Sequence, residues 1–98
     1  MNTANLQLEG LYVVISALLV ALREKGVFEE GEIDRLLAEA ESALVADPNR
    51  PAELRGANVD AICFPVRFLR QALQASSEGR SHSFAHLASR VGQVKRER

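Results

Sequence analysis

The sequence predicts an all-α protein, a four-helix up-down bundle that assembles as a homodimer. Apolar residues recur at spacings of three and four along nearly all of the 98 residues, and no segment alternates with the period of two that is typical of a strand. The run from Leu11 to Leu22 is apolar on every side when it is wound into a helix, so this helix has to be surrounded. A chain of this length forms one core, and we expect a single helical domain over residues 1–98.

Composition and charge are those of a soluble globular domain, with 47% hydrophobic and 26% charged residues and a net charge of −1. The charge is divided, because residues 1–60 carry a net charge of −6 and residues 61–98 a net charge of +5. We interpret this division as an acidic helix that lies beside a basic one, within the fold or across a dimer. A basic surface for nucleic acid is the alternative.

The sequence indicates a cytoplasmic protein. Cys63 is the single cysteine and has no partner for an internal disulfide. The apolar run follows ten residues without Lys or Arg and has no small-residue cleavage pattern, so we expect no secretion. Its 12 residues are fewer than the ~20 that a bilayer span needs, so we expect no membrane association.

The helix expected over residues 5–25 has two apolar sides. One side carries long side chains, namely Leu8, Leu11, Ile15, Leu18 and Leu22, with Tyr12 and Leu19 next to them. The other side carries small or β-branched residues, which let a second helix approach closely: Gly10, Val13, Val14, Ala17 and Ala21. Glu9, Ser16 and Arg23 form a narrow polar seam that we expect to face water.

A tight turn leads to the helix expected over residues 30–45. Gly26 can adopt the left-handed conformation that ends a helix, because glycine has no Cβ. Phe28 and Ile33 have the spacing of a hydrophobic staple around a helix start, with Glu32 at the third helical position. This helix has one apolar face, formed by Ile33, Leu36, Leu37, Ala40 and Leu44.

The stretch from Leu22 to Ile33 resembles the helical hairpin of short SHOCT-type domains, in which a Leu-rich helix, Lys-Gly, an apolar residue and a Glu-Ile helix start follow one another. The resemblance implies a hairpin of two helices. Any αα-hairpin has the same physical requirements, so we assign no family.

Two further helices are expected, over residues 51–75 with a kink at Pro65 and over residues 83–94. The longer one is again two-faced. Its main stripe consists of Val59, Ile62, Cys63, Val66, Leu69 and Leu73, and its second strip of Ala61, Phe64, Phe68 and Ala72. The last helix has one apolar side, formed by Phe84, Leu87, Ala88, Val91 and Val94.

Two-faced helices point to a partner, because two amphipathic helices do not cover both surplus faces in a chain this small. We therefore predict a non-enzymatic association or regulatory module that forms a homodimer, with an unidentified protein as a further possible partner. The predicted dimer interface consists of Gly10, Val13, Val14, Ala17, Val20, Ala21, Phe64 and Phe68. The alternative is a compact monomer in which the helix over residues 5–25 is wrapped on all sides.

No residue pattern indicates catalysis or a cofactor. His82 and His86 lie four apart, as two helical metal ligands do, but neither Cys63 nor Glu78 has a diagnostic spacing for a third ligand. We therefore predict no metal site, and we expect Cys63 to be a buried structural residue.

Two alternative functions remain open from the sequence. Nucleic acid could bind to the basic residues of the C-terminal half, which are Arg67, Arg70, Arg80, Arg90, Lys95, Arg96 and Arg98. A small apolar ligand could bind where a kink at Pro65 opens a pocket beside Phe64 and Phe68.

Overall fold

The computed structural model describes residues 3–47, 57–79 and 83–97, with the backbone alone for residues 57 and 94–97. Four helices occupy these ranges: α1 (Thr3–Glu24), α2 (Glu32–Val45), α3 (Ala57–Ser77) and α4 (Phe84–Glu97). No strand occurs within the described ranges. The predicted all-α class is therefore confirmed, with four helices that pack against one another.

The helix boundaries agree with the predicted ones to within about three residues wherever they are described. The predicted start at Pro51 lies outside the described residues, and α3 runs through Pro65 to Ser77. Gly79, with φ of 72°, takes the left-handed conformation that follows a helix end. At the start of α4 the Ser83 hydroxyl accepts a hydrogen bond from the His86 N–H at 3.1 Å, which satisfies one donor of the first turn.

The turn between α1 and α2 contains two glycines in the left-handed region. Gly26 has φ of 71° and its N–H donates to the Arg23 carbonyl at 3.1 Å, so the predicted helix stop is confirmed. Gly31 has φ of 79° and delays the start of α2 to Glu32. The Glu32 carboxylate accepts a hydrogen bond from the Glu29 N–H at 2.9 Å, which fixes the entry into the helix.

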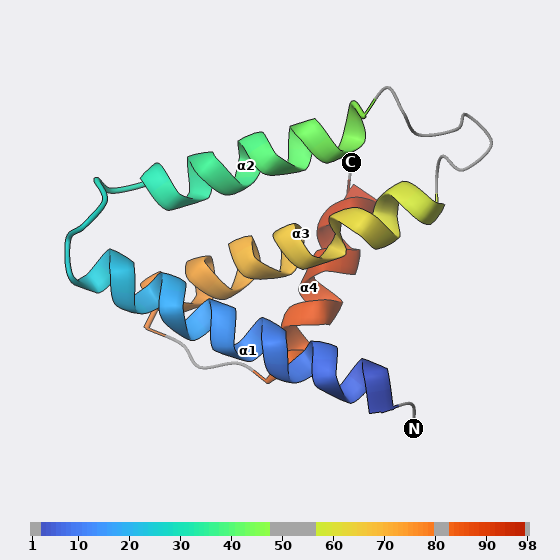
Figure 1. The fold of residues 1–98 in the computed structure, drawn as a ribbon, viewed down its shortest axis with the longest axis horizontal. Coiled ribbons are helices and arrows are strands. Elements are labelled where there is room, and N and C mark those ends of the chain that lie inside the picture. Colours follow the sequence, from blue (N-terminus) through green and yellow to red (C-terminus); the bar gives the residue numbers. More distant parts are fainter. Residues whose placement is uncertain (1–2, 48–56, 80–82, 98) are drawn as a thin grey trace.

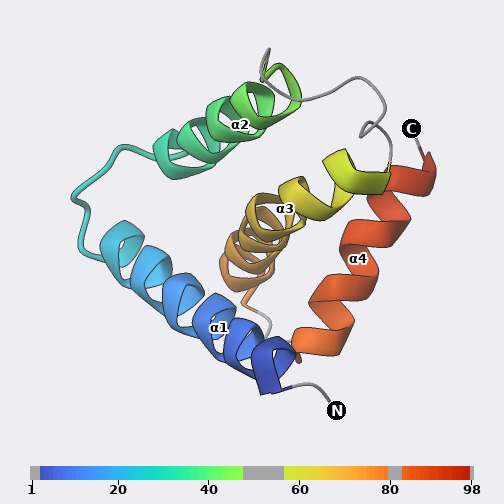
Figure 2. The same ribbon diagram turned by 45° about the vertical axis from the view of Figure 1, so that its right-hand side comes forward.

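The central helix of the molecule is α3, and α1, α2 and α4 all pack on it (Figures 1 and 2). Figure 2 shows α3 enclosed between the other three helices. From their two apolar faces we expected the helices over residues 5–25 and 51–75 to build the core together, and this is wrong for the first of them, since α1 contributes no buried residue. The alternative of an N-terminal helix wrapped on all sides is wrong for the same reason.

The core forms where α3 meets α4 and one side of α1. Its buried residues are Phe68, Ala72, Ala75, Leu87 and Val91. The Tyr12 ring of α1 lies 5.4 Å from the Phe68 ring and 5.8 Å from the Phe84 ring, measured between centroids. These aromatic contacts attach α1 to α3 and α4 at once.

Candidate interaction face

One side of α1 packs against the rest of the chain. Its residues are half-buried and recur at helical spacing: Tyr12, Ile15, Ser16, Leu19, Val20 and Arg23. The remaining described residues of this helix are exposed. The helix therefore lies on the molecule along one side and presents the other side to solvent.

The packing side includes two of the three residues of the predicted polar seam, so the expectation that this seam faces water is wrong for Ser16 and Arg23. The Arg23 guanidinium donates from Nη1 to the Leu73 carbonyl at 2.8 Å and from Nη2 to the Ser76 hydroxyl at 2.9 Å. Both acceptors lie near the C-terminal end of α3, where the helix dipole attracts a cation. The Ser16 hydroxyl is buried without a hydrogen-bond partner among the described residues.

The opposite side of α1 forms an apolar surface, which we name the outer face. Its large side chains are between 36% and 59% exposed: Leu6, Leu11, Val13, Val14, Leu18 and Leu22. Gly10, Ala17 and Ala21 are exposed between them. Together they present an area on the order of 500 Å², which is at the upper end of the largest patch on a typical monomer.

The structure divides the predicted interface residues into two groups. Five of the predicted residues are exposed on the outer face, namely Gly10, Val13, Val14, Ala17 and Ala21. Val20 is half-buried at the edge of the packing side. Phe64 and Phe68 lie in the aromatic cluster of the same chain, and Phe68 is only 1% exposed. We therefore leave Phe64 and Phe68 out of the interface.

The side predicted to carry long side chains does not pack as a unit, because Leu11, Leu18 and Leu22 lie on the outer face whereas Ile15 is half-buried. These leucines are exposed, whereas the longer side chains of Tyr12 and Arg23 pack on α3. A signal for this orientation exists in the sequence, because Tyr12 and Arg23 are 11 residues apart and share one side of a helix. Both side chains have polar groups that can bond to a neighbouring helix while their stems pack against it.

The acidic and basic halves of the chain meet between α2 and α3. Arg67 donates to Glu41 at 2.8 Å and to Asp60 at 3.1 Å. Arg70 donates to Asp34 at 2.9 Å and to Glu41 at 3.3 Å. The hydrogen bond with Glu41 raises the pKa of Arg67, and the hydrogen bond with Asp34 raises the pKa of Arg70. The interpretation that an acidic helix lies beside a basic one is supported within the fold.

These ion pairs bear on the nucleic-acid alternative. The guanidinium groups of Arg67 and Arg70 are already bound to carboxylates, and that of Arg90 lies 3.8 Å from Glu78. The other basic residues of that set lie outside the residues whose side chains are described: Arg80, Lys95, Arg96 and Arg98. The described part of the chain thus offers no unoccupied arginine of this set for phosphate.

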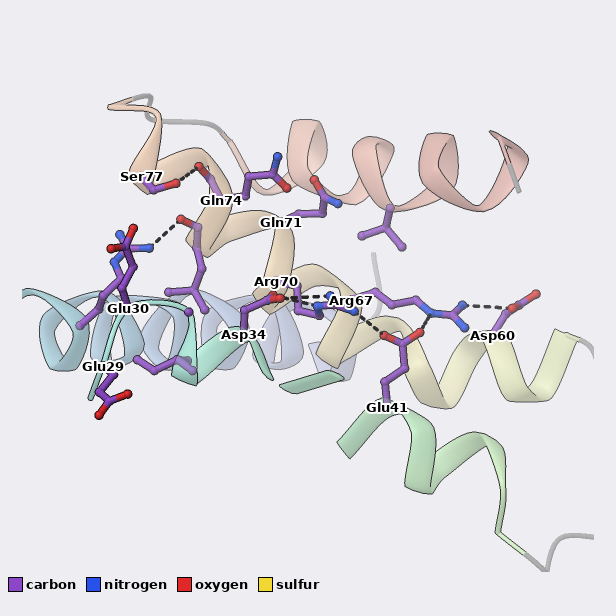
Figure 3. A pocket seen from close by; sticks show the side chains of 15 residues that line it. Glu29, Glu30, Asp34, Glu41, Asp60, Arg67, Arg70, Gln71, Gln74 and Ser77 are labelled. Carbon is purple, nitrogen blue, oxygen red and sulfur yellow. Dashed lines mark hydrogen bonds and ion pairs between the residues drawn. The ribbon is translucent and has the colours of Figure 1, made fainter. Parts of the chain in front are cut away.

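The other predicted sites have simple outcomes. Cys63 is fully buried in α3, as expected. His82 lies outside the described residues, and among the described ones no group of three potential metal ligands comes together. A cavity of about 660 Å³ runs along α2 and α3 (Figure 3), and none of Phe64, Pro65 and Phe68 lines it.

The length and composition of α1 also meet the requirements of a membrane span. The helix has 22 residues, and its 18-residue window has a mean hydropathy of 1.7. The expectation that it is too short rested on the central run, whereas the whole helix is about 33 Å long and matches the ~30 Å of a bilayer core. Core helices of soluble proteins and signal sequences meet the same requirements, but here none of the window is buried.

No family model, no curated protein and no solved structure matches this chain.

Proposed function

We propose that this protein is a non-enzymatic, cytoplasmic self-association module and that a second copy of the chain covers the outer face of α1. The single observation that carries this proposal is the exposure of six leucine and valine side chains along one side of a helix that has no buried residue. In water such a surface is unfavourable, and its burial against a matching surface is the main driving force of association.

The energetics support a reversible dimer. Complete burial of a Leu or Val side chain contributes about 1.5–3 kcal/mol, so a half-exposed one has about 1 kcal/mol left to gain. Six such residues on each of two copies give on the order of 12 kcal/mol, against an association cost of at least ~4 kcal/mol. The difference is at most about 8 kcal/mol, which sets micromolar order as the tightest dissociation constant of such a dimer.

The shape of the outer face supports a close helix pair. Gly10, Ala17 and Ala21 have small side chains, and no atom lies within 4 Å of the Cβ that an alanine at position 10 would add. Two such helices can approach closely while Leu11 and Leu18 pack along their flanks. Two copies of α1 would then lie side by side, each on its own α3.

Light scattering after size exclusion tests the proposal. We expect the wild-type mass to rise with concentration from 10.7 kDa towards twice that value. Ala17→Glu places a charge at the centre of the outer face and should give a monomer at every concentration. Ala43→Glu makes the same change at an exposed position of α2 and should dimerise like the wild type. A wild-type monomer at all concentrations would exclude the dimer.

Membrane insertion of α1 is the second candidate, favoured by its length and apolarity. In the structure α1 is held to α3 by the two hydrogen bonds of Arg23 and by Tyr12, and insertion would break these contacts. Sedimentation with phosphatidylcholine vesicles separates the candidates. Binding to vesicles by a chain that stays monomeric in buffer would replace the dimer by a membrane role.

A further inference from the structure

Among the described helices, α2 is attached to the rest of the molecule through α3. Its contacts with α1 and α4 are weak at most, and Figure 2 shows it apart from both. The turn that joins it to α1 contains two left-handed glycines, Gly26 and Gly31. A few loop residues that can change their backbone conformation are sufficient for a hinge. The position of α2 therefore depends on its contact with α3.

This contact contains little buried hydrocarbon on the α2 side. Ile33 is the only buried apolar residue among the described residues of α2, and the other buried residue is the charged Glu41. Leu37 and Leu44 are half-buried, and Leu36 is 47% exposed. A cavity of about 660 Å³ runs along the same two helices, so they are not closely packed over their whole length. Burial of apolar surface therefore supplies only part of the attachment.

Ion pairs supply the other part of the attachment. Arg67 donates to Glu41 at 2.8 Å (Figure 3). Arg70 donates to Asp34 at 2.9 Å and to Glu41 at 3.3 Å. All three pairs join α3 to α2. The Asp34 side chain is half-exposed, so salt screens its pair, and Glu41 accepts from both arginines only while α2 lies on α3.

One side of α3 lies under α2. Cys63, Val66, Arg70 and Leu73 recur at spacings of three and four and therefore share one side of the helix. Arg70 marks this side as the one that faces α2, because both of its carboxylate partners belong to α2. Cys63, Val66 and Leu73 are buried, but none of them belongs to the core that α3 forms with α1 and α4. We attribute their burial to the cover that α2 provides.

We propose that α2 is a hinged strap that charge holds on α3 and that opens as the ionic strength rises. The open state exposes the side of α3 that carries Cys63, Val66 and Leu73, while α1, α3 and α4 keep the core around Phe68. The strap responds to salt because screening weakens its ion pairs, whereas the core residues carry no charge. The outer face of α1 plays no part in this opening.

The thiol of Cys63 reports on the position of the strap, because it is the single thiol of the chain and is 0% exposed in the closed state. Iodoacetamide is uncharged and alkylates this thiol only when the strap is open. Between 10 mM and 1 M sodium chloride the screening length falls from about 30 Å to about 3 Å. We expect the alkylation rate, relative to that of N-acetylcysteinamide at the same salt concentration, to rise at least about fivefold over this range.

Amide chemical shifts of Phe68 and Leu87 show in the same samples whether the core stays folded. They should remain those of the folded protein at every salt concentration. An alkylation rate that does not change with salt would refute the strap. A rate that rises only when the core shifts are lost would refute it as well, because Cys63 would then react through global unfolding.

Variants of α2 locate the charges that hold the strap. Glu41→Gln keeps the size of the side chain and removes the buried charge, so it should raise the alkylation rate at 10 mM salt at least about tenfold. Asp34→Asn removes a half-exposed charge and should raise the rate about two- to fivefold. Glu39→Gln makes the same change as Glu41→Gln at an exposed position and should react like the wild type.

Equal rates for Glu41→Gln, Asp34→Asn and Glu39→Gln would show that these ion pairs do not hold the strap. Ala17→Glu, the variant that prevents dimerisation through the outer face, should give the wild-type rate at each salt concentration. Failure of the dimer and failure of the strap are therefore distinguishable.

Discussion

Glu41 is the residue that ties α2 most tightly to α3. Glu41 is only 9% exposed, and its carboxylate accepts hydrogen bonds from both Arg67 and Arg70. Asp34, in contrast, lies on the exposed side of the same network. A buried carboxylate between two guanidinium groups interacts with them more strongly than an exposed one, because water screens it less.

Glu41→Gln keeps the size of the side chain and removes its charge, which leaves two partly buried arginines short of a carboxylate. We expect the free energy of unfolding to fall by about 1.5–3 kcal/mol, measured by urea denaturation. Glu39→Gln, at an exposed position two residues earlier, should change it by less than about 0.5 kcal/mol. Equal losses for both variants would contradict the role given to Glu41.

The pH dependence of this network follows from the arginines. The pKa values of Arg67 and Arg70 are raised in the folded state by their carboxylate partners. A group whose pKa is raised on folding stabilises the protein at every pH below its unfolded value and loses this effect only above it. The difference between Glu41→Gln and the wild type should therefore be the same at neutral and at mildly alkaline pH, measured by urea denaturation at both.

At the scale of elements, two glycines have opposite roles, one inside α1 and one directly before α2. Gly10 lies inside α1 in ordinary helical geometry, whereas Gly31 precedes α2 with φ of 79°. A Cβ at either position would meet no atom within 4 Å, so crowding plays no part in a monomer. The backbone conformation alone then decides the sign of an alanine substitution.

Gly10→Ala should raise the stability of α1 by about 0.5–1 kcal/mol, because alanine loses less backbone entropy in a helix. The same methyl group adds bulk to the outer face, so the dimer should weaken. Gly31→Ala should lower the stability by about 1–2 kcal/mol through the left-handed conformation. Urea denaturation of dilute protein measures the first and last effects, and light scattering measures the second. Stabilisation by both substitutions would contradict the left-handed turn.

At the scale of the whole molecule, α3 is the hub and the other helices contact one another weakly at most. Among the described residues, no other helix covers the outer face of α1. The proposed second copy would bind only to the folded state, so association would add to the apparent stability by mass action.

The melting temperature of the wild type should therefore rise with protein concentration, measured by circular dichroism over a hundredfold range. Ala17→Glu should melt at one temperature throughout. A wild-type melting temperature that does not depend on concentration would count against association of the folded chain.

The sequence was sufficient for the number of helices and most of their boundaries, because local rules decide both. The spacing of apolar residues marks the helices, and Gly26 marks the end of α1. The spacing of apolar residues does not give the orientation of α1, since a helix that is apolar all round has no periodicity to show which side packs, and only the positions of Tyr12 and Arg23 on one side signal it. Contacts distant in sequence decide it, above all the bonds from Arg23 to Leu73 and Ser76.

Phe64 and Phe68 were predicted at the interface but pack inside the chain, and the cause is related. Phe64 and Phe68 could contact a second copy only if no other helix of the same chain covered them. The rings of Tyr12 from α1 and Phe84 from α4 cover them. The placement of α4 across α3 is a tertiary property without a local signature. The exposure of five of the six predicted interface residues on α1 needed no such knowledge, because these residues lie away from Tyr12 on the same helix.

The packing of α1 on α3 through Tyr12 and Arg23 has a consequence for the synthesis of the chain. The ribosome synthesises α1 some 50 residues before the part of α3 that receives Arg23, since the bond to Leu73 joins residues that far apart. Until this part of α3 has emerged, the nascent chain presents a helix that is apolar on every side. We expect chaperones that scan growing polypeptides to bind it during this interval.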